Sequence, residues 1–132
     1  MTRIHVPVHI RWNDLDAYGH VNNAAMLTLL EEARISVFWT SGDVGPGEPP
    51  GTAVIDARPG SATVTLVARQ EAEYLAPIPY LRKPLDVQLW IGRLGGASIE
   101  VCYEVCSPLE DEPQVVYARA ATTVVLNEAL HA

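Results

Sequence analysis

One long helix is the feature that most constrains the fold of this chain. Residues 22–39 read NNAAMLTLLEEARISVFW, and their apolar side chains recur at helical spacing. A helix of this length spans roughly 27 Å. We expect it to be largely buried, with Asn22 or Asn23 as its N-cap. Its apolar stripe is wide and consists of Met26, Leu27, Leu29, Leu30, Ala33, Ile35, Val37 and Phe38.

Most of the remaining sequence has the pattern of β-strands joined by short turns. Pro7 favours an edge position for the first strand, because proline cannot donate a ladder hydrogen bond. In residues 62–74 the even positions are mostly apolar and the odd positions mostly polar, which predicts a strand with one solvent-exposed face. The predicted strands are residues 3–12, 52–57, 62–74, 86–94, 98–106 and 114–126.

This order of elements predicts the fold class. A strand, a long buried helix and then four or five antiparallel strands form an α+β layer architecture. Residues 40–51 are dominated by glycine and proline and predict a loop. No linker divides the chain, so we expect residues 1–132 to form a single domain.

The net charge of −7 limits the partners of this chain. A negative field repels nucleic acid and anionic membrane surfaces, so neither is an expected partner. The N-terminal residues lack a signal-peptide core, and no apolar run is long enough to span a membrane. We therefore expect a cytoplasmic protein.

Both cysteines are interpreted as packing residues. In an extended strand Cys102 and Cys106 would lie roughly 13 Å apart, which is too far for a disulfide between them. Two cysteines without histidines at ligand spacing also make a poor zinc site. The sequence predicts neither a metal nor a cofactor.

The stretch RWNDLDAYGHVNN, residues 11–23, is unusually polar for the entrance to a buried helix. As a calcium loop it fails: Asp14, Asp16 and Gly19 match the EF-hand pattern, but Tyr18 and Ala25 occupy positions that need oxygen ligands. As a phosphatase Asp-x-Asp motif it also fails, since no hydrophobic parallel strand precedes it.

Two other interpretations remain. The aspartates can shape a turn while the asparagines cap the helix, as such residues often do. Alternatively, the helix N-terminus polarises a substrate carbonyl, and a carboxylate in the preceding loop attacks it or activates water. One junction would then supply both halves of acyl-transfer catalysis.

The segment RWNDLDAYGHVNNAAMLTLLEEAR resembles the signature of the hotdog-fold acyl-CoA thioesterases of the 4-hydroxybenzoyl-CoA thioesterase-like family. The resemblance continues more weakly through AEYLAPIPYLRKPLDVQLWIGRLGGASIEVCYEV and covers most of the chain. It implies a hotdog fold, in which an antiparallel sheet of five or six strands wraps one long helix. It also implies hydrolysis of a coenzyme A thioester, or of an acyl-carrier-protein thioester.

The resemblance implies a role for each residue of the motif. Asp16 would be the catalytic base or nucleophile, and the Asn23 backbone N–H would face the thioester oxygen. Gly19 would allow close approach of substrate or backbone. His20 and Asn22 would support the junction, and His20 could also act directly in catalysis. Asp14 is expected to shape the loop.

Departures from the family leave the acyl group open. Met26 stands where relatives often have tyrosine, and Leu29 replaces a frequent aromatic residue. The acyl chain would lie near Met26, Leu30 and Phe38. Glu31 is a minor alternative for the catalytic carboxylate, because some hotdog thioesterases use a helix glutamate. The histidine signature of hotdog dehydratases is absent from the sequence.

Further expectations concern binding and assembly. Arg82, Lys83 and Arg93 are candidates for the phosphates of coenzyme A, with solvated surface charges as the competing interpretation. The family implies a homodimer or a dimer-based homotetramer, with each active site built between protomers. The alternative function is a hotdog module that binds an acyl thioester or a partner without hydrolysing it.

Overall fold

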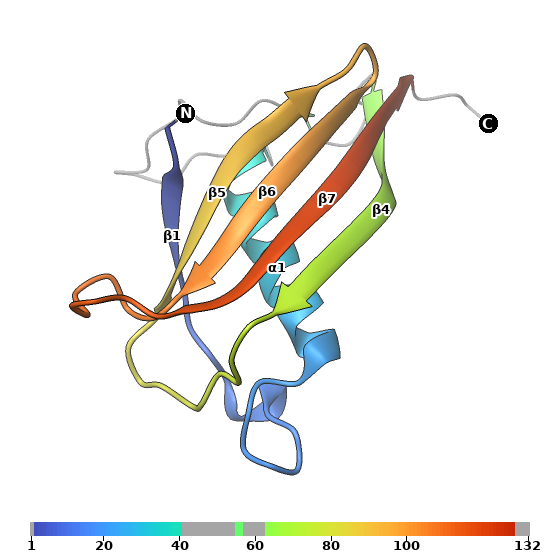
Figure 1. Cartoon of the computed structure of the whole chain (residues 1–132). Helices are drawn as coiled ribbons and strands as arrows, with labels where there is room; N and C mark the ends of the chain where they lie inside the picture. Colours follow the sequence, from blue (N-terminus) through green and yellow to red (C-terminus); the bar gives the residue numbers. More distant parts are fainter. Residues whose placement is uncertain (1, 41–54, 57–62, 129–132) are drawn as a thin grey trace.

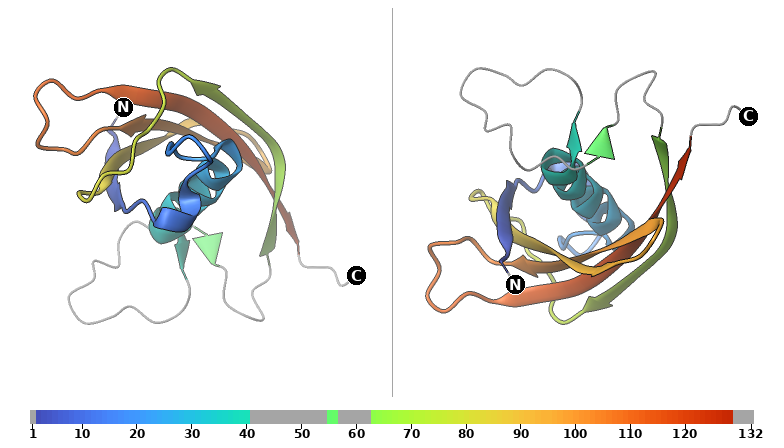
Figure 2. Two further views of the ribbon diagram at one scale, coloured as in Figure 1. Left: turned by 90° about the horizontal axis from the view of Figure 1, so that it is seen from below. Right: turned by 90° about the horizontal axis from the view of Figure 1, so that it is seen from above.

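A five-stranded antiparallel sheet curves around one long helix in the computed structural model, which describes residues 2–40, 55–56 and 63–128 (Figure 1). The sheet order is β1-β5-β6-β7-β4, so β1 and β4 are its edges. Views from below and from above show the sheet bent around α1 (Figure 2). The elements are β1 (Ile4–Val8), a 3-10 helix (Trp12–Asp14), α1 (Asn23–Phe38), β2 (Trp39–Thr40), β3 (Ile55–Asp56), β4 (Thr63–Tyr74), β5 (Leu85–Leu94), β6 (Ser98–Cys106) and β7 (Val116–Glu128).

This architecture confirms the predicted α+β hotdog fold. The edge position of β1, predicted from Pro7, is also confirmed. The short strand predicted at 52–57 does not join the main sheet: Ile55–Asp56 pair in parallel with Trp39–Thr40. The rest of that strand lies outside the described residues, as does nearly all of the predicted loop 40–51.

The helix packs one face into the concave side of the sheet. Most of its predicted apolar stripe is buried, including Leu30 at 2% exposure and Ala33 at 1%. Leu27 and Ile35, however, are 36% and 45% exposed, so the predicted stripe was too wide. The sheet covers one side of α1, and these two side chains lie outside that contact.

A β-bulge interrupts the alternation of apolar and polar residues that was predicted for β4. The register with β7 shifts between Val67 and Arg69. Even-numbered residues of β4 therefore face opposite sides of the sheet before and after the bulge. Leu66, expected on the apolar face, is 57% exposed. Periodicity alone cannot place such a bulge, because one extra residue reverses the face of every side chain beyond it.

The two cysteines are free thiols, and no disulfide joins them. Cys106 is buried, and this burial, together with the nearby Glu104 and Asp86 carboxylates, raises the pKa of its thiol to about 11. Cys106 is therefore protonated at neutral pH and packs as a small apolar residue, as predicted.

Candidate active site

Asp16 belongs to a tight turn between the 3-10 helix and α1, and the segment that joins these two elements lies at the lower end of the sheet in Figure 1. The Asp16 N–H donates to the His20 carbonyl at 2.7 Å, and the Gly19 N–H donates to the Asp16 carbonyl at 3.1 Å. Gly19 has a φ of 78°, a conformation that side chains other than glycine rarely adopt. A Cβ at this position would meet nothing within 4 Å, so this chain requires glycine for backbone conformation rather than for space.

Backbone donors hold the Asp16 carboxylate in place. Its Oδ1 accepts the N–H of Tyr18 at 2.8 Å and the N–H of His20 at 3.1 Å. Its Oδ2 accepts no hydrogen bond from the described residues. The carboxylate is thus oriented by one oxygen, while the other oxygen remains available to a substrate or a water molecule.

Asn22 caps α1 as predicted. Its Oδ1 accepts the Ala24 N–H at 2.7 Å, and its carbonyl accepts the Met26 N–H at 2.9 Å, which begins the helical ladder. The N–H of Asn23, the first helical residue, donates to no acceptor in the described part of the chain. This N–H and the positive end of the helix dipole form an anion-stabilising group at the junction.

Asp14 connects the preceding loop to the helix start. Its buried carboxylate accepts the Arg11 backbone N–H at 2.7 Å and Arg11 Nη2 at 2.9 Å. Its carbonyl accepts the Asn22 N–H at 2.7 Å. Burial alone would raise the pKa of this carboxyl, but the hydrogen bonds and charge of Arg11 outweigh burial and hold the pKa below its usual range. Asp14 therefore shapes the loop.

We predict that Asp14→Asn lowers stability by about 1–3 kcal/mol at neutral pH, because an amide cannot replace a buried, ion-paired carboxylate. Since the pKa is depressed in the folded state, this stabilisation is complete above the unfolded-state pKa of about 3.9 and is lost as pH falls through the lower folded-state pKa. Melting curves between neutral and acid pH should therefore converge for the two proteins. A constant difference down to strongly acid pH would contradict this account.

A hollow of about 310 Å³ opens at this junction and is called the Asp16 hollow. It brings together the loop, the helix start and the connection after β4. Three sequence-predicted catalytic residues, Asp16, His20 and Asn23, line it together with Met26. Its remaining wall was not predicted and consists of Val21, Tyr74, Leu75, Ala76, Pro77 and Ile78.

Hydrogen bonds between residues far apart in the sequence join the unpredicted wall to the loop and to the start of α1. The Val21 N–H donates to the Ile78 carbonyl at 2.9 Å, and the Tyr74 hydroxyl lies 3.4 Å from the Asn23 carbonyl. Only AEYLAPIPY, within the weaker part of the family resemblance, marked this segment in the sequence. The His20 ring makes no hydrogen bond to the described residues. The expected support of the junction by this ring is therefore not seen in the described part of the chain.

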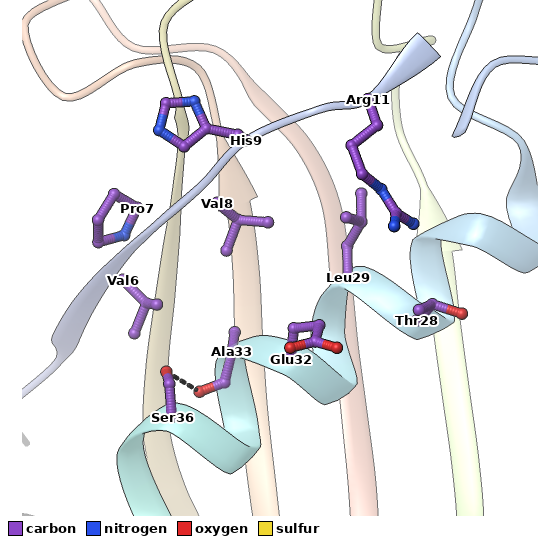
Figure 3. A pocket seen from close by; sticks show the side chains of 10 residues that line it. All are labelled: Val6, Pro7, Val8, His9, Arg11, Thr28, Leu29, Glu32, Ala33 and Ser36. Carbon is purple, nitrogen blue, oxygen red and sulfur yellow. Dashed lines mark hydrogen bonds between the residues drawn. The ribbon is translucent and has the colours of Figure 1, made fainter. Parts of the chain in front are cut away.

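A larger groove of about 470 Å³ lies between β1 and α1 (Figure 3). Val8 and Leu29 lie between the strand and the helix, while Arg11 and Glu32 supply charges of opposite sign. The groove contains none of the predicted catalytic residues. Size alone does not identify the site, and the chemistry gathers at the smaller Asp16 hollow.

The predicted phosphate-binding residues lie outside the hollow. Arg82 and Lys83 are exposed on the same β4–β5 connection that forms its wall, and Lys83 pairs with Glu110 at 3.1 Å. Arg93 is near the end of β5, at the opposite end of the sheet from Asp16. Glu31 is half-exposed and lies 3.8 Å from Arg34, away from the hollow.

Two general features of the described residues bear on the chemistry. They include no cluster of three or more His, Cys, Asp or Glu side chains that could hold a metal ion. None of their helices has the length and apolar character needed to cross a membrane.

Comparisons with known proteins match most of this chain to one family. Residues 10–128 match the family model of the thioesterase-like superfamily. The uncharacterized protein YsmA of Bacillus subtilis is 28% identical over 107 residues, which cover 80% of this chain and 62% of that protein. The chain thus spans less than two thirds of the length of this relative.

Solved structures share the fold. XC229 of Xanthomonas campestris, provisionally named an acyl-CoA thioesterase, has a TM-score of 0.66 and 28% identity, with coverage of 92% of this chain and 90% of that one. PA2801 of Pseudomonas aeruginosa, provisionally named a thioesterase, has a TM-score of 0.64 and 32% identity, with coverage of 94% and 82%. Slr0204, a 1,4-dihydroxy-2-naphthoyl-CoA thioesterase from Synechocystis, shares the fold at 15% identity, a TM-score of 0.62 and coverage of 97% and 82%.

Proposed function

Since the chain belongs to the thioesterase-like superfamily, we propose that it hydrolyses acyl thioesters of coenzyme A. The family supports thioester hydrolysis in general. The observation that carries the proposal is the shared position of Asp16 and Asn23 on one hollow, with the Asp16 carboxylate fixed through Oδ1 and open at Oδ2. A pocket that only binds an acyl thioester has no need of a carboxylate held in this way.

In this mechanism the thioester carbonyl oxygen docks at the helix N-terminus. The Asn23 N–H and the helix dipole stabilise the negative charge that develops on that oxygen, an effect worth ~10²–10³ in rate for a single donor. Asp16 Oδ2 either takes a proton from the attacking water or attacks the carbonyl carbon itself. With Asp16 as the base, water adds to the carbonyl carbon, the carbon–sulfur bond breaks, and the acid and the coenzyme A thiol leave, the thiolate taking up the proton. With Asp16 as the nucleophile, the same bond breakage releases coenzyme A and leaves an anhydride between Asp16 and the acyl group, which a water molecule then hydrolyses to release the acid.

The connection after β4 is the proposed route of the coenzyme A arm. Its first residues, Leu75 to Ile78, form the hollow wall, and the same segment continues to the exposed Arg82 and Lys83. A nucleotide leaving the hollow along this segment would reach two cations in an otherwise acidic protein. Arg93 would need to come from a partner subunit, because it lies at the far end of the sheet.

We predict that the double variant Arg82→Ala, Lys83→Ala raises KM for acyl-CoA about tenfold or more, because two phosphate contacts are lost. Hydrolysis of the matching pantetheine thioester, which lacks the nucleotide, should be nearly unchanged. Steady-state kinetics on both substrates provide the measurement. An equal loss on both would assign these residues a structural role instead.

The open edge of the sheet supports a homodimer or a dimer-based tetramer. β4 has twelve residues and contains no proline, whereas Pro7 protects the opposite edge, β1. Leu66 and Val67 of β4 are 57% and 47% exposed. The charged residues of β4, Arg69, Glu71 and Glu73, all lie in its second half, and a long exposed edge strand is a template for pairing with another strand. We propose that β4 pairs with its own copy in the partner subunit and completes each active site.

Two alternatives remain within this proposal. The substrate could be an acyl-carrier-protein thioester, which presents the same pantetheine arm, or the protein could bind thioesters without hydrolysing them. A hydrolysis screen with acyl-CoA and acyl-carrier-protein esters separates these functions. Turnover that depends on Asp16 supports the enzyme, whereas saturable binding with no turnover across the panel would establish the binding module. The free cysteines agree with a reducing cytoplasm, the proposed location.

A further inference from the structure

Two aromatic rings stack beside the junction that carries Asp16. The rings of Trp12 and Tyr80 are parallel within 2°, and their centroids are 4.6 Å apart, a favourable offset-stacked geometry. Trp12 is nonetheless 73% exposed. Tyr80 covers one face of the Trp12 ring, and no other ring or cation of the described residues stacks on the opposite face. We call these two residues the Trp12 platform.

The platform is fixed next to the Asp16 hollow. Three successive residues of the β4–β5 connection each contact the loop that precedes α1: Ile78 with Val21, Pro79 with His20 and Tyr80 with Trp12. Ile78 lines the hollow, whereas Trp12 and Tyr80 do not. Tyr80 is two residues farther along the chain, a span of roughly 7 Å. The platform is therefore a neighbour of the hollow and not a part of its wall.

Positive charges flank the platform in a chain whose net charge is −7. They are Arg11, directly before Trp12, and Arg82 and Lys83, shortly after Tyr80. Arg11 and Lys83 each pair with a carboxylate of the protein, whereas Arg82 makes no ion pair with another described residue. An open aromatic face beside exposed cations suits a nucleotide, because the base stacks on the ring while the phosphates meet the cations.

We propose that the open face of the Trp12 ring stacks on the adenine of coenzyme A. This inference rests on the proposed thioesterase function and assigns the nucleotide end of its substrate. The acyl group and the thioester occupy the hollow at Asp16, so a ring outside the hollow meets the other end of the molecule. The pantetheine arm follows the β4–β5 connection, the phosphates lie at Arg82 and Lys83, and the base lies against Trp12.

The platform is already formed without a ligand. Trp12 begins the 3-10 helix Trp12–Asp14, in which the Leu15 N–H donates to the Trp12 carbonyl at 3.2 Å. Tyr80 then holds the ring itself in place. A rigid ring loses little conformational entropy on binding, so most of the stacking energy contributes to affinity. Removing a ring that stacks on a base weakens binding by about 5- to 100-fold.

The first test compares the affinities for coenzyme A and for 4′-phosphopantetheine, which lacks the adenosine. Calorimetric titration should show that Trp12→Leu weakens binding of coenzyme A about 5- to 100-fold and leaves binding of 4′-phosphopantetheine nearly unchanged. Trp12→Phe keeps a ring and should retain most of the affinity. Coenzyme A should quench tryptophan fluorescence in the wild-type protein but not in Trp12→Phe, in which the other two tryptophans remain.

Hydrolysis gives a second readout. Trp12→Leu should raise KM for acyl-CoA by a similar factor with little change in kcat, and it should leave both constants for the acyl-phosphopantetheine thioester nearly unchanged. Leu94→Ala is the matched control, because Leu94 is 72% exposed and lies at the end of β5 opposite Asp16. This variant should bind and hydrolyse both compounds like the wild-type protein.

The outcomes separate this inference from the function beneath it. Equal weakening of both ligands by Trp12→Leu would overturn the adenine site, whether the variant stays assembled in sedimentation velocity or dissociates. Tighter binding of ATP than of coenzyme A would also overturn it and assign the platform to a free nucleotide. Hydrolysis of acyl-CoA with an affinity that does not depend on Trp12 would overturn this inference alone. Binding of coenzyme A through Trp12 without hydrolysis of any thioester would overturn the proposed function and support the adenine site.

Discussion

Asp16→Asn is expected to lower kcat by ~10²–10⁴, the usual cost of removing a general base, or by more if Asp16 is the nucleophile. The substitution is nearly isosteric. The amide oxygen can still accept the Tyr18 and His20 N–H groups that bind Oδ1, so the turn should persist. Only Oδ2, the oxygen without a partner among the described residues, is replaced by a poor base. Melting temperature and affinity for acyl-CoA should therefore change little.

Asp14→Asn is the matched control, because both aspartates belong to the same short loop. Asp14 is buried against Arg11 and does not line the Asp16 hollow, so its substitution should reduce stability more than turnover. The turnover number of each variant is measured below its melting transition, and the melting temperature of each is determined separately. Near-wild-type hydrolysis by Asp16→Asn would contradict a catalytic role for residues 11–23. These residues would then only form a turn and cap the helix.

The sequence was most informative where structure depends on local chemistry. The spacing from Met26 to Phe38 predicted the helix, and Asn22 was a recognisable cap because its side chain binds an N–H two residues away. The grouping of Asp16, His20 and Asn23 could be predicted because all three lie within one turn and the helix start that follows it. Pro7 likewise marked an edge strand through the absence of an N–H.

The remaining features depend on contacts that a linear pattern does not contain. The β4 bulge turns Leu66 away from its expected face, and Leu27 and Ile35 are exposed because no second layer covers them among the described residues. The hollow wall at Tyr74 and Ile78 comes from a segment more than fifty residues beyond the helix start, and only the fold brings it there. Arg34 is buried, although two charged residues precede it in EEAR.

Val67→Lys is expected to separate the proposed dimer and to lower activity with it. Val67 is near the middle of β4 and is half-exposed. In an antiparallel pair of identical strands, residues near the two-fold axis lie opposite their own copies, so the variant would bring like charges together. Burial of a valine contributes about 1.5–3 kcal/mol, and the dimer would lose this twice. The dissociation constant should rise about 10²-fold or more.

Leu109→Lys provides the control for this edge. Leu109 is 62% exposed and lies in the β6–β7 connection, away from β4, so its substitution adds the same charge without touching the proposed interface (Figure 1). Sedimentation velocity at the assay concentration should show a dimer or tetramer for the wild-type protein and for Leu109→Lys, and a monomer for Val67→Lys. Activity should follow the assembled fraction, because the β4 edge borders the Asp16 hollow through Tyr74. A stable, fully active wild-type monomer would refute the shared site, and a Val67→Lys protein that remains dimeric would place the interface elsewhere.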